Sequence, residues 1–139
     1  MDNAELLAIQ PTEYLKNGFY DKDGEALEGV NGFYSLAMAY RLREEQMNPD
    51  ELKKIVDRLM EIVPRHDRAV EDNPQLPLDA DSRAALEEVT KKSASPTLTA
   101  IFDAGRPWVK DWRTYAALTL HLQRILSQLA LLRSLSEKE

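Results

Sequence analysis

One segment of the chain, GRPWVKDWR at residues 105–113, combines residue types suited to binding anions or partner surfaces. A helix there would place three cations on one face, four and three residues apart: Arg106, Lys110 and Arg113. Three aromatic residues would take the neighbouring face: Trp108, Trp112 and Tyr115. Cations beside aromatic rings can bind phosphates and stack on bases. Tryptophan, tyrosine and arginine are also favoured anchors of protein interfaces.

Three interpretations of this basic-aromatic segment are open. The favoured one is structural, with the tryptophans anchoring a helix to the core while the cations keep it solvated. A protein-binding surface comes next. Nucleic-acid binding comes last, because a chain with a net charge of −6 would repel a phosphate backbone everywhere except at this segment.

The DKDGE segment at residues 21–25 invites comparison with a calcium-binding loop. In such a loop the glycine is sixth, and a bidentate glutamate is twelfth. Placing Gly24 sixth puts Phe19 first and Val30 twelfth, and neither side chain can bind calcium. We therefore expect a polar turn here and predict no metal site.

The two histidines do not occur in a metal-binding pattern. A helical carboxylate di-metal site would need Glu-x-x-His pairs, but Val63 and Leu118 stand three residues before His66 and His121. We expect His66 to be exposed in a connector and His121 to pack beside the last helix.

Other catalytic motifs are missing from the sequence. It contains no HExxH, no GxSxG and no glycine-rich phosphate loop. Paired glutamates such as Glu44/Glu45 and Glu87/Glu88 are typical of solvated helix surfaces. The sequence therefore predicts a protein that is not an enzyme, with no catalytic residue, no metal and no cofactor.

A cluster of aromatic residues could form a small-ligand pocket. Its members would come from the front of the chain and from the last helix: Phe19, Tyr20, Phe33, Tyr34 and Trp112. Aromatic residues at helical spacing are more often packed together, so a mixed aromatic core is favoured over a pocket.

Length and composition predict one domain, residues 1–139, with a substantial core because 43% of the residues are hydrophobic. The absence of cysteine fits a reducing compartment, and the N-terminus does not resemble a signal peptide, so we expect a cytoplasmic protein.

The charges are unevenly distributed along the chain. Residues 1–51 hold 11 acids and 4 bases, whereas residues 52–139 hold 13 acids and 14 bases. The locally basic last helix could thus face the acidic front or an anionic partner.

Capping residues and periodicity predict an all-α protein, a compact bundle of four to six helices with a long C-terminal core helix. We expect helices at residues 3–10, 25–46, 49–63, from a cap at Asp79 or Asp81 to about 92, 96–105 and 107–135. Residues 64–81 form a proline-rich internal connector. The core is expected between the helices 25–46, 49–63 and 107–135.

The two front core helices have broad apolar faces. In the first, one stripe is widened by a second row: Ala26, Val30, Phe33, Ala37 and Tyr40, with Leu27, Tyr34, Met38 and Leu42. The next helix is expected to bury Leu52, Ile55, Val56, Leu59, Met60 and Val63.

The last helix has a seam of apolar residues spaced 3, 4, 3, 4 and 3 apart: Tyr115, Leu118, Leu122, Ile125, Leu129 and Leu132. Leu126 and Ala130 are expected to widen it. A different face carries Leu120, Leu131 and Leu135. Polar residues interrupt the segment 116–135 too often for a membrane span, so a buried helix is predicted.

The sequence thus favours a non-enzymatic protein-interaction or regulatory and assembly domain, with self-association into a homodimer as one use of the apolar excess. The first alternative is a nucleic-acid-binding accessory protein, and the second is a small-ligand sensor. The candidate partner-binding residues come from the last helix and its start: Arg106, Trp108, Lys110, Trp112, Arg113, Leu120, Leu131 and Leu135.

Overall fold

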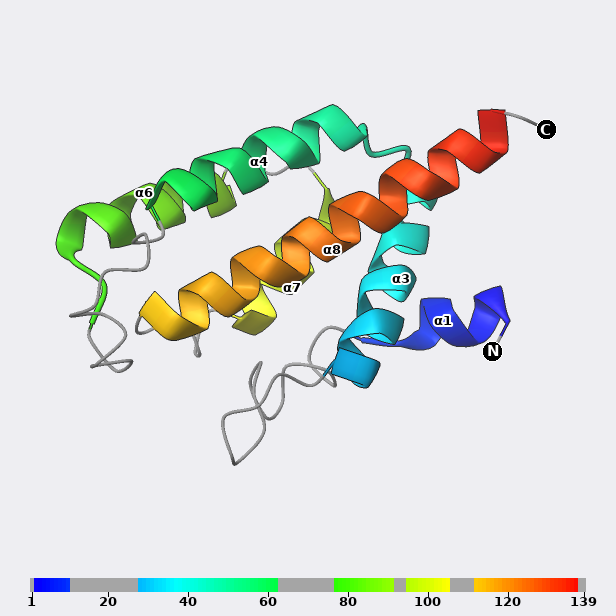
Figure 1. Ribbon diagram of the computed structural model, residues 1–139, viewed down its shortest axis with the longest axis horizontal. Coiled ribbons are helices and arrows are strands. Elements are labelled where there is room, and N and C mark those ends of the chain that lie inside the picture. The colour runs from blue at the N-terminus through cyan, green and yellow to red at the C-terminus, as the bar shows by residue number, and fades with distance from the viewer. Residues whose placement is uncertain (1, 11–27, 63–76, 92–94, 106–111, 138–139) are drawn as a thin grey trace.

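The computed structural model describes residues 2–10, 28–62, 77–91, 95–105 and 112–137. Within these ranges the chain forms six α-helices (Figure 1). They are α1 (Asn3–Ala8), α3 (Glu28–Glu44), α4 (Pro49–Ile62), α6 (Ala80–Lys91), α7 (Pro96–Gly105) and α8 (Trp112–Glu137). The predicted all-α bundle with a long C-terminal helix is confirmed.

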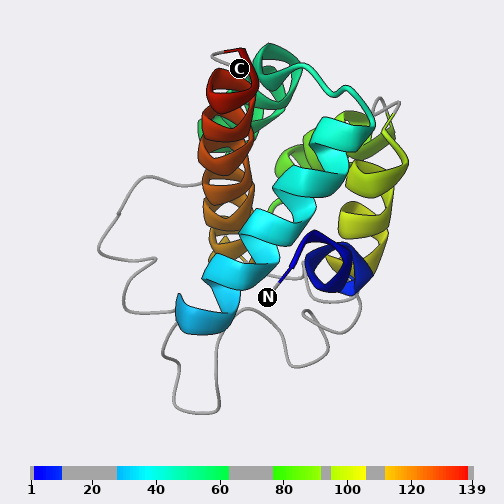
Figure 2. The ribbon, with the colours of Figure 1, turned by 90° about the vertical axis from the view of Figure 1, so that its right-hand side faces the viewer.

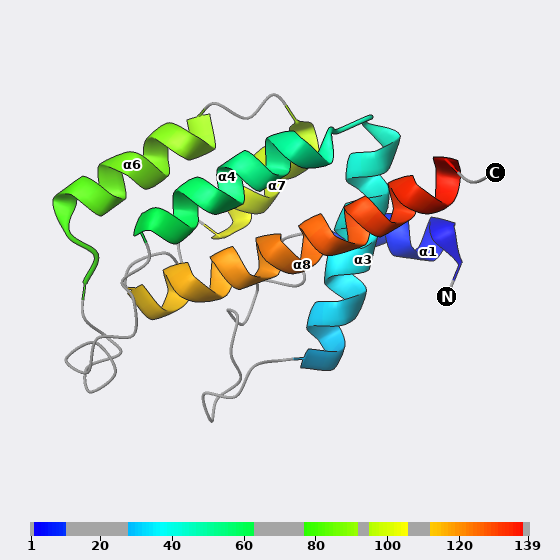
Figure 3. The same cartoon turned by 45° about the horizontal axis from the view of Figure 1, so that its top comes forward.

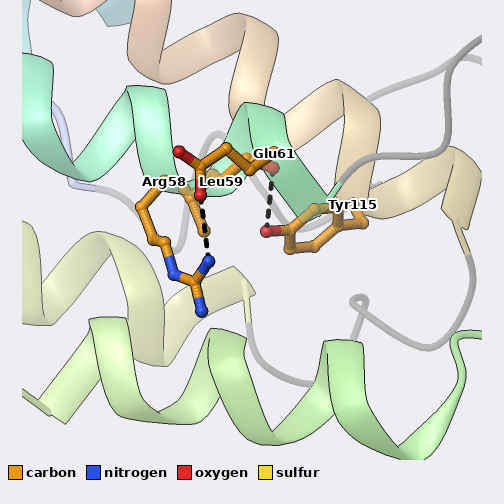
Figure 4. A network of polar contacts seen from close by, with 4 residues as sticks. All are labelled: Arg58, Leu59, Glu61 and Tyr115. Carbon is orange, nitrogen blue, oxygen red and sulfur yellow. Dashed lines mark hydrogen bonds and ion pairs between the residues drawn. The ribbon is translucent and has the colours of Figure 1, made fainter.

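Helix α8 is the element on which the larger helices converge. It lies alongside α4 and crosses α3 steeply (Figure 3). The pair α4 and α8 is antiparallel. At one end the Tyr115 hydroxyl donates to the Leu59 carbonyl at 3.4 Å (Figure 4). At the other end the Arg133 guanidinium donates to the Met47 carbonyl, just before α4 begins.

The predicted seam of α8 is confirmed, because all six of its residues are buried. Leu126 is partly buried against the same core. Ala130 is exposed, so the prediction that it widens the seam was wrong. Its position on the helix lies outside the arc that α3 and α4 cover.

Helix α3 buries residues from both predicted rows, because Ala37 of the first stripe is fully buried together with three residues of the second. Tyr34, Met38 and Leu42 are at most 1% exposed, whereas Phe33 is 54% exposed and Tyr40 is half-buried. The helix is packed by α8, α1 and α7 together, and the end view shows α1 beside it (Figure 2). The surrounding helices, and not the apolar pattern of α3, therefore select which arc becomes the core.

Helix α3 ends at Glu44, two residues before the predicted boundary, because Gln46 adopts a left-handed conformation with φ of 60°. The Met47 amide then donates to the Leu42 carbonyl at 2.8 Å, and the Gln46 amide to the Arg43 carbonyl at 2.9 Å. These two bonds form a Schellman motif, in which glycine usually takes the left-handed position. A side chain there costs about 1 kcal/mol.

Helix α4 begins as the sequence predicts. The Asn48 side chain accepts a hydrogen bond from the Asp50 amide at 2.8 Å, and Pro49 takes the first helical position. Leu52, Val56 and Leu59 are buried and Ile55 is half-buried. The prediction for Met60 was wrong: its side chain is 47% exposed, on an arc that neither α8 nor α6 covers.

The predicted α6 and α7 starts are also confirmed. Asp79 rather than Asp81 caps α6, because its carboxylate accepts from the Ser82 amide at 2.7 Å, and this bond lowers the pKa of Asp79. The predicted connector 64–81 lies mostly outside the described residues, and its last two positions belong to α6. The Ser95 hydroxyl caps α7 by accepting from the Leu98 amide at 3.2 Å.

Helices α6 and α7 both contribute side chains to the core. Leu98, Ile101 and Phe102 of α7 are buried, and Leu86 and Val89 of α6 pack against the core. None of the helices in the described ranges combines the length and apolar content that a membrane-spanning segment requires.

The short α1 packs against α3 and also accepts a hydrogen bond from an α3 side chain. The Asp2 and Glu5 side chains cap its start reciprocally. At its end the Arg41 guanidinium of α3 donates to the Leu7 carbonyl, with the Nε atom at 3.0 Å. Leu6 is 5% exposed and belongs to the core.

Candidate functional site

The basic-aromatic segment lies largely outside the described residues. Arg106, Trp108 and Lys110 belong to the range 106–111, and the side chain of Arg113 is also outside the described part. Trp112 is partly buried and packs against the core. Binding of a partner or of nucleic acid by this segment therefore stays a prediction.

The three leucines outside the α8 seam are all exposed: Leu120 by 44%, Leu131 by 55% and Leu135 by 50%. Leu131 and Leu135 are four residues apart, so their side chains are neighbours on one helical face. Leu120 lies three turns away, about 16 Å along the helix. The exposed Ser127 and the partly exposed Arg124 stand between them. The exposed leucines therefore form two sites, of which only the pair Leu131/Leu135 is continuous.

His121 is a packing residue, as the sequence analysis expected. Its side chain is 3% exposed, and its ring forms a T-shaped pair with the Tyr34 ring, with 6.1 Å between the centroids and an interplanar angle of 76°. Burial, with a smaller contribution from the charge of Arg124, lowers the pKa of His121 to about 3. The imidazole is therefore neutral at pH 7 and cannot act as a proton donor there.

Glu45 corrects the expectation that the paired glutamates are ordinary solvated charges. One of its oxygens accepts from the Thr97 amide at 3.0 Å and from the Thr97 hydroxyl, and the other accepts from the Ser95 hydroxyl. The carboxylate therefore holds the end of α3 against the start of α7, where the positive end of the helix dipole favours negative charge. Sequence reasoning missed this contact because the partners lie 50 and 52 residues apart.

A cavity of about 690 Å³ opens beside Glu45, between the α3–α4 turn, α4, the end of α6 and the start of α7. It is lined by charged and apolar side chains together: Glu45, Gln46, Met47, Glu51, Lys54, Ile55, Arg58, Glu88, Val89, Ser95 and Pro96. The sequence held one signal for it. Glu51, Ile55 and Arg58 repeat at helical spacing on one face of α4, but nothing local indicated what that face adjoins.

The predicted aromatic pocket is a different place from this cavity, whose lining contains no aromatic residue. Of its five proposed members, Phe19 and Tyr20 lie outside the described residues. Tyr34 is in the core at 1% exposure, whereas Phe33 is 54% exposed. Nothing in the described part brings these side chains around a common space.

Metal-binding groups do not gather in the described part of the chain, where no three histidine, aspartate or glutamate side chains are placed to hold an ion. A scan against protein-family models found no match for this chain, and neither did searches of curated proteins and of solved structures. No residue role is therefore carried over from a relative.

Proposed function

We propose that this protein is a non-enzymatic interaction or assembly domain, which associates through the leucine pair formed by Leu131 and Leu135 at the end of α8. The single observation that carries the proposal is the exposure of this pair, at 55% and 50%, on a helix whose six seam residues are all buried. Exposed apolar residues that adjoin one another are typical of protein contact sites. The lack of cysteine supports a reducing compartment such as the cytoplasm.

The simplest partner is a second copy of this chain, because a symmetric dimer lets the same leucine pair cover itself. Each leucine already has about half of its surface covered. Burial of the remainder therefore contributes only roughly 1 kcal/mol per side chain. Association itself costs at least about 4 kcal/mol, so burial of the four leucines only about offsets that cost, and a dimer at high protein concentration needs further contacts beside the leucine pair.

Sedimentation across a wide dilution series tests this proposal. We expect the weight-average mass to rise with concentration, and Leu131→Lys or Leu135→Lys to abolish the rise. Leu120→Lys is the matched control, because it places the same charge on an equally exposed leucine of the same helix outside the pair. A mass that stays monomeric throughout, or that responds to Leu120→Lys as strongly as to Leu131→Lys, contradicts self-association.

A different protein partner is the other form of the same proposal. Affinity purification from the native cell, with nuclease-treated and untreated arms, should then recover a protein that the Leu131→Lys variant loses. Recovery that depends on nucleic acid would instead favour the first alternative function. Both alternatives depend on residues outside the described ranges, and no observation within those ranges favours either.

A further inference from the structure

The last turn of α8 lies beyond the buried part of the helix. Leu132, at 7% exposure, is its last core residue, and residues 134–137 are all exposed. This end of the helix extends past the crossing with α3 (Figure 1). Leu131 adjoins Leu132 and is held with the core, whereas Leu135 lies one turn beyond Leu131. Helix ends fray where tertiary contacts are few, so a fixed position for Leu135 requires an anchor close to it.

Arg133 forms a contact suited to this purpose. Its guanidinium donates to the carbonyl of Met47 in the α3–α4 turn, 86 residues away in the sequence. The side chain is partly buried, and its Nε atom is fully enclosed. A hydrogen bond from a charged donor is stronger than one between neutral groups. The contact therefore attaches the end of α8 to a distant part of the chain.

The acceptor of this bond lies in a turn that other contacts hold in place. The Met47 amide donates to the Leu42 carbonyl at 2.8 Å, and the Met47 side chain packs against the core. Glu45, two residues earlier, accepts from the Thr97 amide of α7 at 3.0 Å. Because the turn is fixed, a bond to it restricts the donor, so Arg133 limits the motion of the last turn of α8.

Arg133 lies away from the exposed face that the leucine pair forms. Leu131 and Leu135 are each two residues from it, which is about 200° around a helix with 3.6 residues per turn. A substitution at Arg133 therefore leaves the leucines themselves unchanged. An effect of such a substitution on association would come from the position of the pair and not from a lost contact with the partner.

From these observations we infer that Arg133 is a positioning residue for the leucine pair. Its bond to Met47 keeps the last turn of α8 helical, so that Leu131 and Leu135 form one face before a second copy binds. The inference rests on the proposed self-association through this pair. Ordering a contact face in advance lowers the cost of binding. The apparent affinity falls with the fraction of molecules in which that face is ordered, and in a dimer this fraction enters once for each copy.

Hydrogen exchange and sedimentation of Arg133→Met test the inference together. Methionine resembles arginine in helix propensity and has an unbranched side chain, but it cannot donate to the Met47 carbonyl. In dilute protein, the amides of residues 134–137 should exchange roughly tenfold faster, while the α8 seam keeps its protection. At high concentration, association should weaken roughly three- to tenfold.

Two further variants separate the hydrogen bond from general effects of substitution. Arg133→Lys keeps a charged donor and should retain most of the protection and of the association. Arg124→Met is the matched control, because it removes a similarly half-buried arginine of α8 that takes no part in the Met47 contact. It should leave both measurements unchanged.

The possible results distinguish the role of Arg133 from the proposed function. The inference is overturned if Arg133→Met leaves the exchange of residues 134–137 unchanged, if it accelerates exchange without weakening association, or if Arg124→Met has the same effects. A natural chain that stays monomeric at every concentration contradicts the proposed self-association instead. The exchange comparison in the monomer then decides by itself whether Arg133 holds the last turn.

Discussion

The two ends of α4 are attached to the rest of the protein by different kinds of contact. Near its C-terminal end, Leu59 is fully buried and Tyr115 of α8 reaches the Leu59 carbonyl. Before its N-terminal end, the turn is held by polar groups, through Glu45 with Ser95 and Thr97 and through Arg133. The apolar end of α4 is held by the packing of buried side chains, whereas the turn before its polar end is held by individual hydrogen bonds.

This difference has consequences for how each end responds to substitution. Burial of a large side chain involves many weak contacts, so its loss costs more than any one hydrogen bond. The polar end contributes less stability, but it fixes the geometry of the cavity that adjoins it. We therefore expect large stability effects at the apolar end, and smaller ones with local structural consequences at the polar end.

The largest effect is expected for Leu59→Ala at the apolar end. Removing a fully buried leucine leaves a void, and the free energy of unfolding should fall by about 2–5 kcal/mol. Met60→Ala, at the neighbouring residue with 47% exposure, should change it by less than about 1 kcal/mol. Urea denaturation measures both, and equal losses for the two variants would mean that the packing of α4 differs from that described.

His121, a titratable residue of α8 that is buried in the core, gives a second test of the apolar packing. His121 has a folded-state pKa of about 3, below the usual 6.5, so the folded protein favours the neutral ring. Stability from this residue is fully present above pH 6.5 and is lost as the pH falls towards 3, by up to roughly 4 kcal/mol.

Denaturant unfolding at a series of pH values, for the natural chain and for His121→Leu, isolates the contribution of His121 to stability. The two chains have the same carboxylates, so the pH dependence of those groups cancels in the difference. The difference in unfolding free energy between them should narrow or reverse as the pH falls. A difference that stays constant from pH 7 to pH 4 would show that the His121 ring is not buried in its neutral form.

At the polar end, Glu45→Ala should cost about 1–2 kcal/mol, because it leaves the backbone amide of Thr97, a residue that is 6% exposed, without its acceptor. Hydrogen exchange should accelerate at Thr97 while the α8 seam keeps its protection. Glu44→Ala serves as the comparison, since Glu44 forms a long ion pair, 3.8 Å to Arg43, on the exposed side of the same turn. Identical hydrogen-exchange rates at Thr97 in the two variants would show that Glu45 does not hold α3 against α7.

The smallest effect is expected at Gln46, where glycine should stabilise the protein by about 0.5–1 kcal/mol. Glycine adopts the left-handed conformation of this turn, φ 60°, without the steric cost of a side chain. Gln46→Ala keeps the Cβ atom and should bring no gain. Thermal unfolding of the two variants measures the difference, and a lower melting temperature for the glycine variant would rule out strain at this position.

The sequence by itself determined where α4 and α7 begin and which arc of α8 is buried. Asn48 with Pro49, and Ser95 with Pro96, specify helix starts through contacts within a few residues. The α8 seam follows from spacing alone, because residues three and four apart share a helical face. These features are local, so they could be read without knowing the neighbours of each helix.

Only the tertiary structure decided which residues of the broad apolar face of α3 turn inward, and so placed Tyr34 in the core and Phe33 at the surface. It also brought Glu45 to Ser95, 50 residues away, and Arg133 to Met47, 86 residues away. The cavity exists because those contacts fix the turn beside α4 and α6. Such contacts depend on how helices from distant parts of the chain pack together, and no local pattern of residues encodes that arrangement.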